Sequence, residues 1–454
     1  MDYDFTEGSI SKKLIKFTLP ILLALILQLL YGAVDLLIVG NFALASDISA
    51  VSTGFQFISV FINLIAGLAM GSTILIGQKI GSKENRVLGE VIGSALFIFL
   101  IISILMAIVL GFNGNFFASL INAPKEAFAK TSSYISVLGF GSIFLVAYNV
   151  LGSIFRGLGD SKTPLYAVIM ATVINIILDY IFVAIFATGA FGAAVATVIA
   201  QALSVALSLF VIVRRKKTFT ISFQDVGFHK VYTKKTISLG APLAINSFLV
   251  SLSFTFILGI VNKFGVVASA GVGVTERLIG FLMLIPMSFG QAISSFTAQN
   301  VGANKHERAK KGLTVAMSIS TMAAIVMVVV SLLFGKQMLG IFSRDPLVII
   351  PAFEYLKSYC FDIFFTAFLF TSIGFFNGYG LTKFTMISGI LGALAIRIPV
   401  AYLFSTFKPV SIFLIGLGTP IGTLFQLILS YFYFRIIQKN IIKKSKYSED
   451  RKTV

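Results

Sequence analysis

The sequence predicts an all-α polytopic membrane protein with twelve transmembrane helices, arranged as two pseudo-symmetric six-helix lobes around a central cavity. Three observations predict this fold class. The 454 residues are 57% hydrophobic and only 12% charged, a balance that soluble domains do not show. Long apolar runs recur along the whole chain. Short motifs in the first half return at nearly one interval in the second half.

Each apolar run is long enough to cross a bilayer as a helix, because about 20 residues span the hydrocarbon core. Chains inside a bilayer must satisfy their backbone polar groups internally, so helices are the expected element. The twelve expected spans lie at about residues 14–39, 48–76, 89–111, 131–155, 164–186, 190–213, 236–262, 266–290, 312–334, 349–376, 384–407 and 411–436.

The distribution of Lys and Arg predicts the orientation of these spans. With an even number of spans both termini lie on one side of the membrane. If that side is cytoplasmic, the inner segments hold 27 Lys and Arg and the outer segments hold 7. This bias is the positive-inside pattern, so we expect cytoplasmic termini. The net charge of +18 therefore reflects topology, and no nucleic-acid partner is expected.

The chain divides at a basic segment near its middle. We expect an N-terminal lobe at 1–213, a cytoplasmic loop at 214–235, a C-terminal lobe at 236–437 and a basic cytoplasmic tail at 438–454. Three repeats support two halves of the same orientation. Pro20 and Pro242 are 222 residues apart. GQKIG (77–81) recurs as AQNVG (298–302), and RGLGDSK (156–162) recurs as NGYGLTK (377–383), each after 221 residues. Such repeats are typical of secondary transporters. Pro20 and Pro242 also predict kinks in spans 1 and 7.

Four polar residues of the first half share one depth in the membrane. Asp35 lies in the outer part of span 1. Asn175 and Asp179 are four residues apart on one face of span 5, and Thr197 lies about two turns below the outer surface in span 6. Carboxylate, amide and hydroxyl oxygens are ligands that Na⁺ or a proton would use. We therefore expect a coupling-cation site at these residues, although separate helix-packing roles remain the alternative.

At these motifs the sequence resembles the MATE (multidrug and toxic compound extrusion) transporters. The resemblance covers nearly the whole chain and rests on LPILLALILQLLYGAVDLLIVG, GQKIG, RGLGDSKTP, NIILDYIFV, GAFGAAVATVIAQ and GYGLTK. It implies export of organic cationic or amphipathic compounds in exchange for Na⁺ or H⁺, without another cofactor. It also implies a cation site built from an Asp of span 1, an Asn and Asp of span 5 and a Thr of span 6.

The second half departs from the first at the equivalent positions. Ile257 stands where Asp35 would repeat, and Arg397 falls near the place of Asn175. Glu276 and Asp362 are acids near the middle of their spans. We expect an internal ion pair between Arg397 and one of these acids, and we interpret Asp362 as the acid with the stronger claim to a functional role.

Two other function classes compete with antiport. A lipid-linked saccharide flippase of the same fold superfamily would need several Arg within the spans, and only Arg277 and Arg397 occur there. A membrane-embedded enzyme would need a nucleophile–base set or a metal motif, and the two His both lie in basic loops. We therefore expect a secondary transporter in a bacterial cell membrane, acting as a monomer because the path is complete within one chain.

Overall fold

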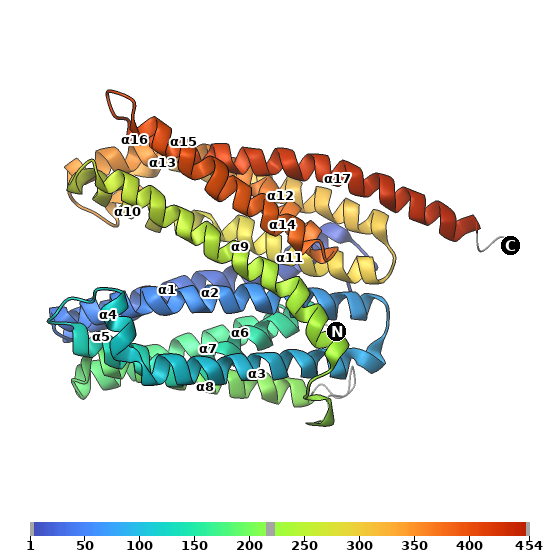
Figure 1. The fold of residues 1–454 in the computed structure, drawn as a ribbon, viewed down its shortest axis with the longest axis horizontal. Helices are drawn as coiled ribbons and strands as arrows, with labels where there is room; N and C mark the ends of the chain where they lie inside the picture. Colours follow the sequence, from blue (N-terminus) through green and yellow to red (C-terminus); the bar gives the residue numbers. More distant parts are fainter. Residues whose placement is uncertain (1–3, 215–222, 451–454) are drawn as a thin grey trace. The chain divides into compact units, whose positions relative to one another are not determined.

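The computed structural model describes residues 4–214 and 223–450. Within them every regular element is helical and no strand occurs. The chain forms two compact units, Met1–Ile245 and Asn246–Val454. In Figure 1 the helices of each unit lie side by side as a bundle, blue to green in the first and yellow to red in the second.

The first unit contains eight α-helices and the start of a ninth among the described residues. They are α1 (Ile10–Phe42), α2 (Ala45–Gly81), α3 (Leu88–Phe112), α4 (Gly114–Leu120), α5 (Phe128–Phe140), α6 (Ser142–Gly157), α7 (Lys162–Asp179), α8 (Gly189–Arg214) and the first part of α9 (Lys230–Asn262). Three short elements join them, namely η1 (Asn85–Val87), the π-helical η2 (Tyr180–Ile185) and η3 (Phe223–Asp225).

The second unit contains the rest of α9 and the remaining helices. They are α10 (Val266–Leu282), α11 (Leu284–Gly302), α12 (His306–Gly340), α13 (Pro346–Gly378), α14 (Thr382–Ile390), the π-helical η4 (Leu391–Arg397), α15 (Ile398–Ser405), α16 (Ile412–Gly416) and α17 (Gly418–Asp450). The central helix of this unit is α13, which packs against α10, α11, α12, α16 and α17.

The helices account for the expected spans. In the described residues, ten helical segments are long and apolar enough to cross a membrane. Two further spans appear as bent pairs, α5 with α6 at 53° and α10 with α11 at 40°. Counting each pair as one span gives the twelve that the sequence predicts. The all-helical membrane fold is thereby confirmed.

The turns at the matched motifs repeat their backbone conformation. Gly159 and Gly380 both have positive φ, at 77° and 79°, and Lys83 and Asn304 have φ of 58° and 57°. Both pairs are 221 residues apart. The glycine-rich motifs thus form tight turns between helices, because glycine adopts positive φ without steric cost.

The expected lobe boundaries stay a prediction. Helix α9 begins at Lys230, inside the expected loop at 214–235, and α17 continues through the expected tail to Asp450. Residues 215–222 of that loop and 451–454 of that tail lie outside the described residues.

Candidate functional site

The four residues predicted for the cation site lie together in the first unit. Asp35 comes from α1, Asn175 and Asp179 from the end of α7, and Thr197 from α8; these three helices pack against one another. All four side chains are buried, with Asp35 4% exposed and Asp179 fully buried. The Asp35 and Asp179 carboxyl groups are close enough to share a hydrogen bond when one of them is protonated.

The polar atoms of this cluster are mostly without partners. Among the described residues, Asp35 Oδ1, both carboxylate oxygens of Asp179 and both amide atoms of Asn175 make no hydrogen bond. No described Lys, Arg or His has a nitrogen within 4 Å of either carboxylate. A buried carboxylate without a cation is strongly disfavoured, so this arrangement calls for a bound cation or a proton.

A tyrosine that the sequence reading missed is bonded to this cluster. The Tyr31 hydroxyl donates a hydrogen bond to Thr197 Oγ1 at 3.0 Å, which joins α1 to α8. Tyr31 stands four residues before Asp35, so helical spacing places them on one face and could have identified it.

The backbone changes form immediately after Asp179. Helix α7 ends at that residue, and the π-helical segment Tyr180–Ile185 follows before α8 begins at Gly189. Short π-helical segments cost hydrogen-bond quality and are frequent at functional sites. The wider turn sets the direction of the Asp179 end of α7, and nothing in the sequence signals it.

A further buried acid, Asp47, is fully engaged in structure. Its Oδ2 lies 2.6 Å from the Lys130 ammonium, and its Oδ1 accepts a hydrogen bond from the Ala190 amide at 3.0 Å. It also accepts a bond from the amide of Leu44. Asp47 therefore ties the start of α2 to α5 and to the start of α8, and leaves no oxygen for another ligand.

The three candidate residues of the second unit, Glu276, Asp362 and Arg397, differ in their partners. Asp362 is buried and accepts a hydrogen bond from Thr423 Oγ1 at 2.5 Å. Glu276 is half-buried and its Oε1 has no hydrogen-bond partner among the described residues. Tyr359 of α13 is buried, and its hydroxyl shares a hydrogen bond of 3.2 Å with Thr419 of α17.

The expected ion pair of Arg397 was wrong for this structure. Within the described ranges no nitrogen of Arg397 comes within 4 Å of a carboxylate oxygen of Glu276 or Asp362. Instead its Nη1 donates to Ser253 Oγ at 3.0 Å, and its guanidinium lies 4.4 Å from the centre of the Phe254 ring. These contacts tie the guanidinium to α9, although its buried Nε has no hydrogen-bond partner among the described residues.

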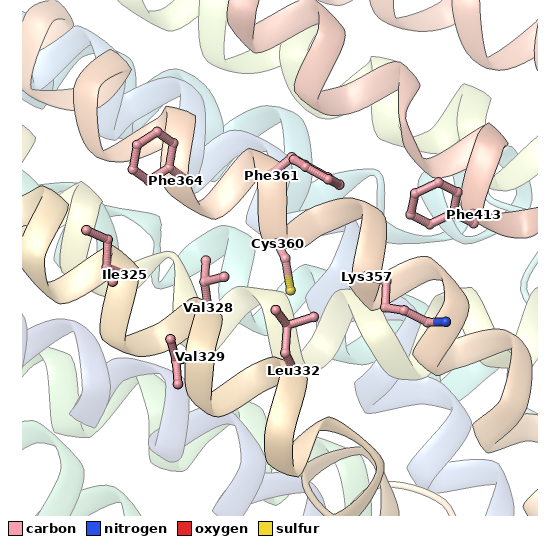
Figure 2. Close-up of a pocket in the computed structure, with 9 residues that line it drawn as sticks. All are labelled: Ile325, Val328, Val329, Leu332, Lys357, Cys360, Phe361, Phe364 and Phe413. Carbon is pink, nitrogen blue, oxygen red and sulfur yellow. The ribbon is translucent and has the colours of Figure 1, made fainter.

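An apolar pocket of about 450 Å³ opens elsewhere in the second unit, between α12, α13 and α16. Figure 2 shows Cys360 with its sulfur directed toward Leu332 of α12, and Lys357 at one end of the pocket. None of the predicted site residues lines it. The pocket is therefore separate from both polar clusters.

Comparison with known proteins places the chain in a family. The MatE family model matches residues 20–181 and again 242–403, so the two matches begin at the paired prolines and cover most of the chain. The chain belongs to the MATE family. It is accordingly a transporter and not an enzyme.

Relatives of this MATE protein cover almost its whole length. It is 27% identical to the probable multidrug resistance protein YoeA of Bacillus subtilis, over 96% of this chain and 95% of that protein. It is 24% identical to the multidrug export protein MepA of Staphylococcus saprophyticus, over 86% of this chain and 87% of that one. A crystal structure of MATE in complex with MaL6 shares the fold, with a TM-score of 0.91, 22% identity and coverage of 97% and 98%.

Proposed function

We propose that this chain is a cation-coupled antiporter that exports organic cationic or amphipathic compounds. One observation supports the coupling most directly: two adjacent buried carboxylates, Asp35 and Asp179, have no cationic partner among the described residues. An uncompensated charge inside the membrane costs free energy, so a buried pair of carboxylates without a basic partner is expected where a transported cation binds between them.

The ligand set suits Na⁺ or a proton as the coupling ion. Oxygens of Asp35, Asp179, Asn175 and Thr197 would hold Na⁺, since hard cations take carboxylate, carbonyl and hydroxyl ligands. A proton would be shared between the two carboxyl groups instead. The hydrogen bond from Tyr31 fixes the Thr197 hydroxyl, so that its remaining lone pair can face the ion.

Coupling requires the ion to prefer one state of the transporter. A ligand shifts a conformational equilibrium only by its difference in affinity between the two states. We propose that the two lobes give alternating access to a central cavity, and that filling the site changes the contacts of α1 with α7 and α8. Pro20 in α1 and Pro242 in α9 are the points where these helices could bend, because each lacks one backbone hydrogen bond.

The second unit offers a subordinate polar cluster. Asp362 keeps one carboxylate oxygen free of the Thr423 bond, and the half-buried Glu276 has an Oε1 without a hydrogen-bond partner among the described residues. We propose that Asp362 contributes to substrate or ion binding. We propose a structural role for Arg397, whose Nη1 bonds Ser253 and whose guanidinium lies over the Phe254 ring.

The cargo is proposed to be cationic or amphipathic and not an anionic lipid-linked saccharide. The relatives are named for multidrug resistance and multidrug export. A pyrophosphate-bearing cargo would need several arginines within the spans, and only Arg277 and Arg397 occur there. We propose a monomer, because one chain supplies both lobes.

Substrate charge separates the two cargo classes in a direct test. Cells expressing the protein should accumulate less of a cationic dye than cells without it, while an anionic dye of similar size is unaffected. Reconstituted protein should not move a lipid-linked saccharide across the bilayer. Saccharide movement without dye export would replace antiport with the flippase alternative.

A further inference from the structure

A second apolar groove lies between α12, α13 and α17, near the start of α12. Its volume is about 400 Å³, and apolar side chains from all three helices form its walls. The groove is lined by Leu313, Met317, Phe368, Phe376, Leu427 and, at one end, Lys310. It runs along α12 from its second turn toward the interior of the span, so one end is basic and the rest is apolar.

A small pocket with a mixed polar and aromatic lining continues the groove at its basic end. This pocket of about 30 Å³ shares Lys310 and Phe434 with the groove and is otherwise lined by His306, Glu307, Phe375, Tyr379, Ile437 and Gln438. Helix α12 begins at His306, so the small pocket lies at the end of the span and the groove lies deeper. That order matches a lipid, with a headgroup at the surface and an acyl chain below.

The charges at this end favour an anion. Lys310 is half-buried, and no described carboxylate oxygen lies within 4 Å of its ammonium. Arg435 and Lys439 are exposed on α17 on either side of Gln438 and form no ion pair in the described part of the chain. Glu307 is the single acid that lines either pocket, and Lys310 balances its charge. Arg435 and Lys439 follow the lining residues Phe434 and Gln438 in sequence, so the surface beside the pockets on α17 is net basic.

We propose that this groove binds an anionic phospholipid, with the headgroup phosphate at Lys310 and one acyl chain along α12 and α17. Basic pockets between transmembrane helices recognise anionic headgroups in this way. The aliphatic stem of Lys310 packs along the groove while its ammonium reaches the surface. The bound lipid would hold α12 and α17 together over α13 in the second unit.

The pocket of Figure 2 provides an internal contrast. It has a similar volume and apolar walls, and it also has one lysine at its end. There, however, the Lys357 ammonium pairs with Glu354 at 2.6 Å. An acyl chain could enter this pocket as well, but its neutralised lysine gives no reason to prefer an anionic headgroup.

The natural chain contains no tryptophan, which allows a site-specific test by fluorescence. Phe434→Trp places one tryptophan in the groove, and Phe432→Trp places one on the same helix at an exposed position that lines neither pocket. Both variants are reconstituted in bilayers that mix phosphatidylcholine with phosphatidylglycerol. In one set of bilayers the phosphatidylcholine carries brominated acyl chains, and in the other set the phosphatidylglycerol carries them. Bromine quenches tryptophan on contact, so the quenching gives the relative affinity of the two lipids at each position.

The proposal predicts about a fivefold preference for phosphatidylglycerol at position 434 and none at position 432. Adding Lys310→Gln to Phe434→Trp should abolish that preference, while the neighbouring control Lys311→Gln, which lines neither pocket, should retain it. Phe413→Trp, in the pocket of Figure 2, should show no preference. If Phe434→Trp does not fold, Tyr431→Trp takes its place, since Tyr431 also lines the groove.

Three results would overturn the proposal. Equal quenching by both lipids at position 434 would mean that any acyl chain fills the groove. Absence of quenching there by either lipid would mean that the groove is closed. A preference that survives Lys310→Gln but falls with Lys311→Gln would assign the headgroup to a different surface.

Discussion

At the scale of single residues, the candidate site depends on what is missing around Asp35 and Asp179. Each is a buried acid, and the described surroundings supply neither a basic side chain nor a full set of hydrogen bonds. Asp47 differs from this pair, because both of its carboxylate oxygens accept hydrogen bonds, from the Lys130 ammonium and from two backbone amides. Burial of an acid therefore does not identify a site by itself, whereas an unsatisfied pair of acids does.

The sequence could predict these four residues from depth alone, but not their partners. Asp35, Asn175, Asp179 and Thr197 are rare polar residues in apolar runs, and the topology assigns them a common level. Tyr31 is one of 14 tyrosines, and its spacing of four residues from Asp35 places both on one helical face without showing what its hydroxyl bonds. Only the packing of α1 against α8 shows that this hydroxyl bonds Thr197.

The first residue-scale prediction concerns Tyr31. Removing its hydroxyl in Tyr31→Phe deletes the bond to Thr197, a loss of about 1 kcal/mol in a net hydrogen bond. The concentration of coupling cation that gives half-maximal efflux should rise about fivefold, with the maximal rate nearly unchanged. Titration of dye efflux against Na⁺ and against pH measures this. An unaltered titration would remove Tyr31 from the site.

The second residue-scale prediction concerns Asp47. Asp47→Asn breaks the contact with Lys130 and weakens the bonds from Ala190 and Leu44, so stability should fall by about 2 kcal/mol. Thermal unfolding in detergent should show the loss, while efflux per folded molecule persists. Glu354→Gln removes an exposed ion pair and should leave stability nearly unchanged. Loss of ion coupling in folded Asp47→Asn would contradict the structural role.

At the scale of helices, the sequence located the spans but not their interruptions. The expected spans at 131–155 and 266–290 are bent pairs, which break at Gly141 and Met283. Apolar composition persists through each break, so hydropathy cannot reveal it. The π-helical segments after Asp179 and before Ile398 could not be predicted either. Each is only six or seven residues long, and a hydrophobic period cannot be resolved over so short a segment.

One element-scale prediction tests the close approach of α11 and α13. A Cβ added to Gly374 would lie 2.2 Å from the carbonyl oxygen of Gly290. Gly374→Ala should therefore push the two backbones apart and cost about 1–3 kcal/mol of stability. Gly273→Ala in α10 meets nothing within 4 Å and should be neutral or slightly stabilising. Equal thermal stability of the two variants would show that α11 and α13 can move apart at this contact at little cost in free energy.

At the scale of the whole molecule, the internal repeat connects the sequence to the family. The MatE matches begin at residues 20 and 242, the same interval that separates the repeated prolines. The repeat is nevertheless unequal in chemistry. Buried Ile257 stands in α9 where α1 carries Asp35, so the candidate coupling site belongs to the first unit alone.

The expected orientation can be tested across the chain. Cys360 is the sole cysteine, so Cys360→Ser gives a cysteine-free background. In intact cells a membrane-impermeant maleimide should label Lys125→Cys, in an expected outer segment, and should not label Lys383→Cys, in an expected inner turn. Permeabilised cells should label both. The opposite pattern in intact cells would invert the predicted topology.

The central claim is that a cation gradient drives export through the Asp35 and Asp179 pair. The most direct measurement is efflux of a fluorescent cationic dye from proteoliposomes, with a Na⁺ gradient and a pH gradient imposed separately. The wild-type protein should respond to one gradient, and that response should fall at least about tenfold in Asp35→Asn and in Asp179→Asn, while Glu354→Gln keeps it. Undiminished gradient-driven efflux in Asp35→Asn would contradict the account.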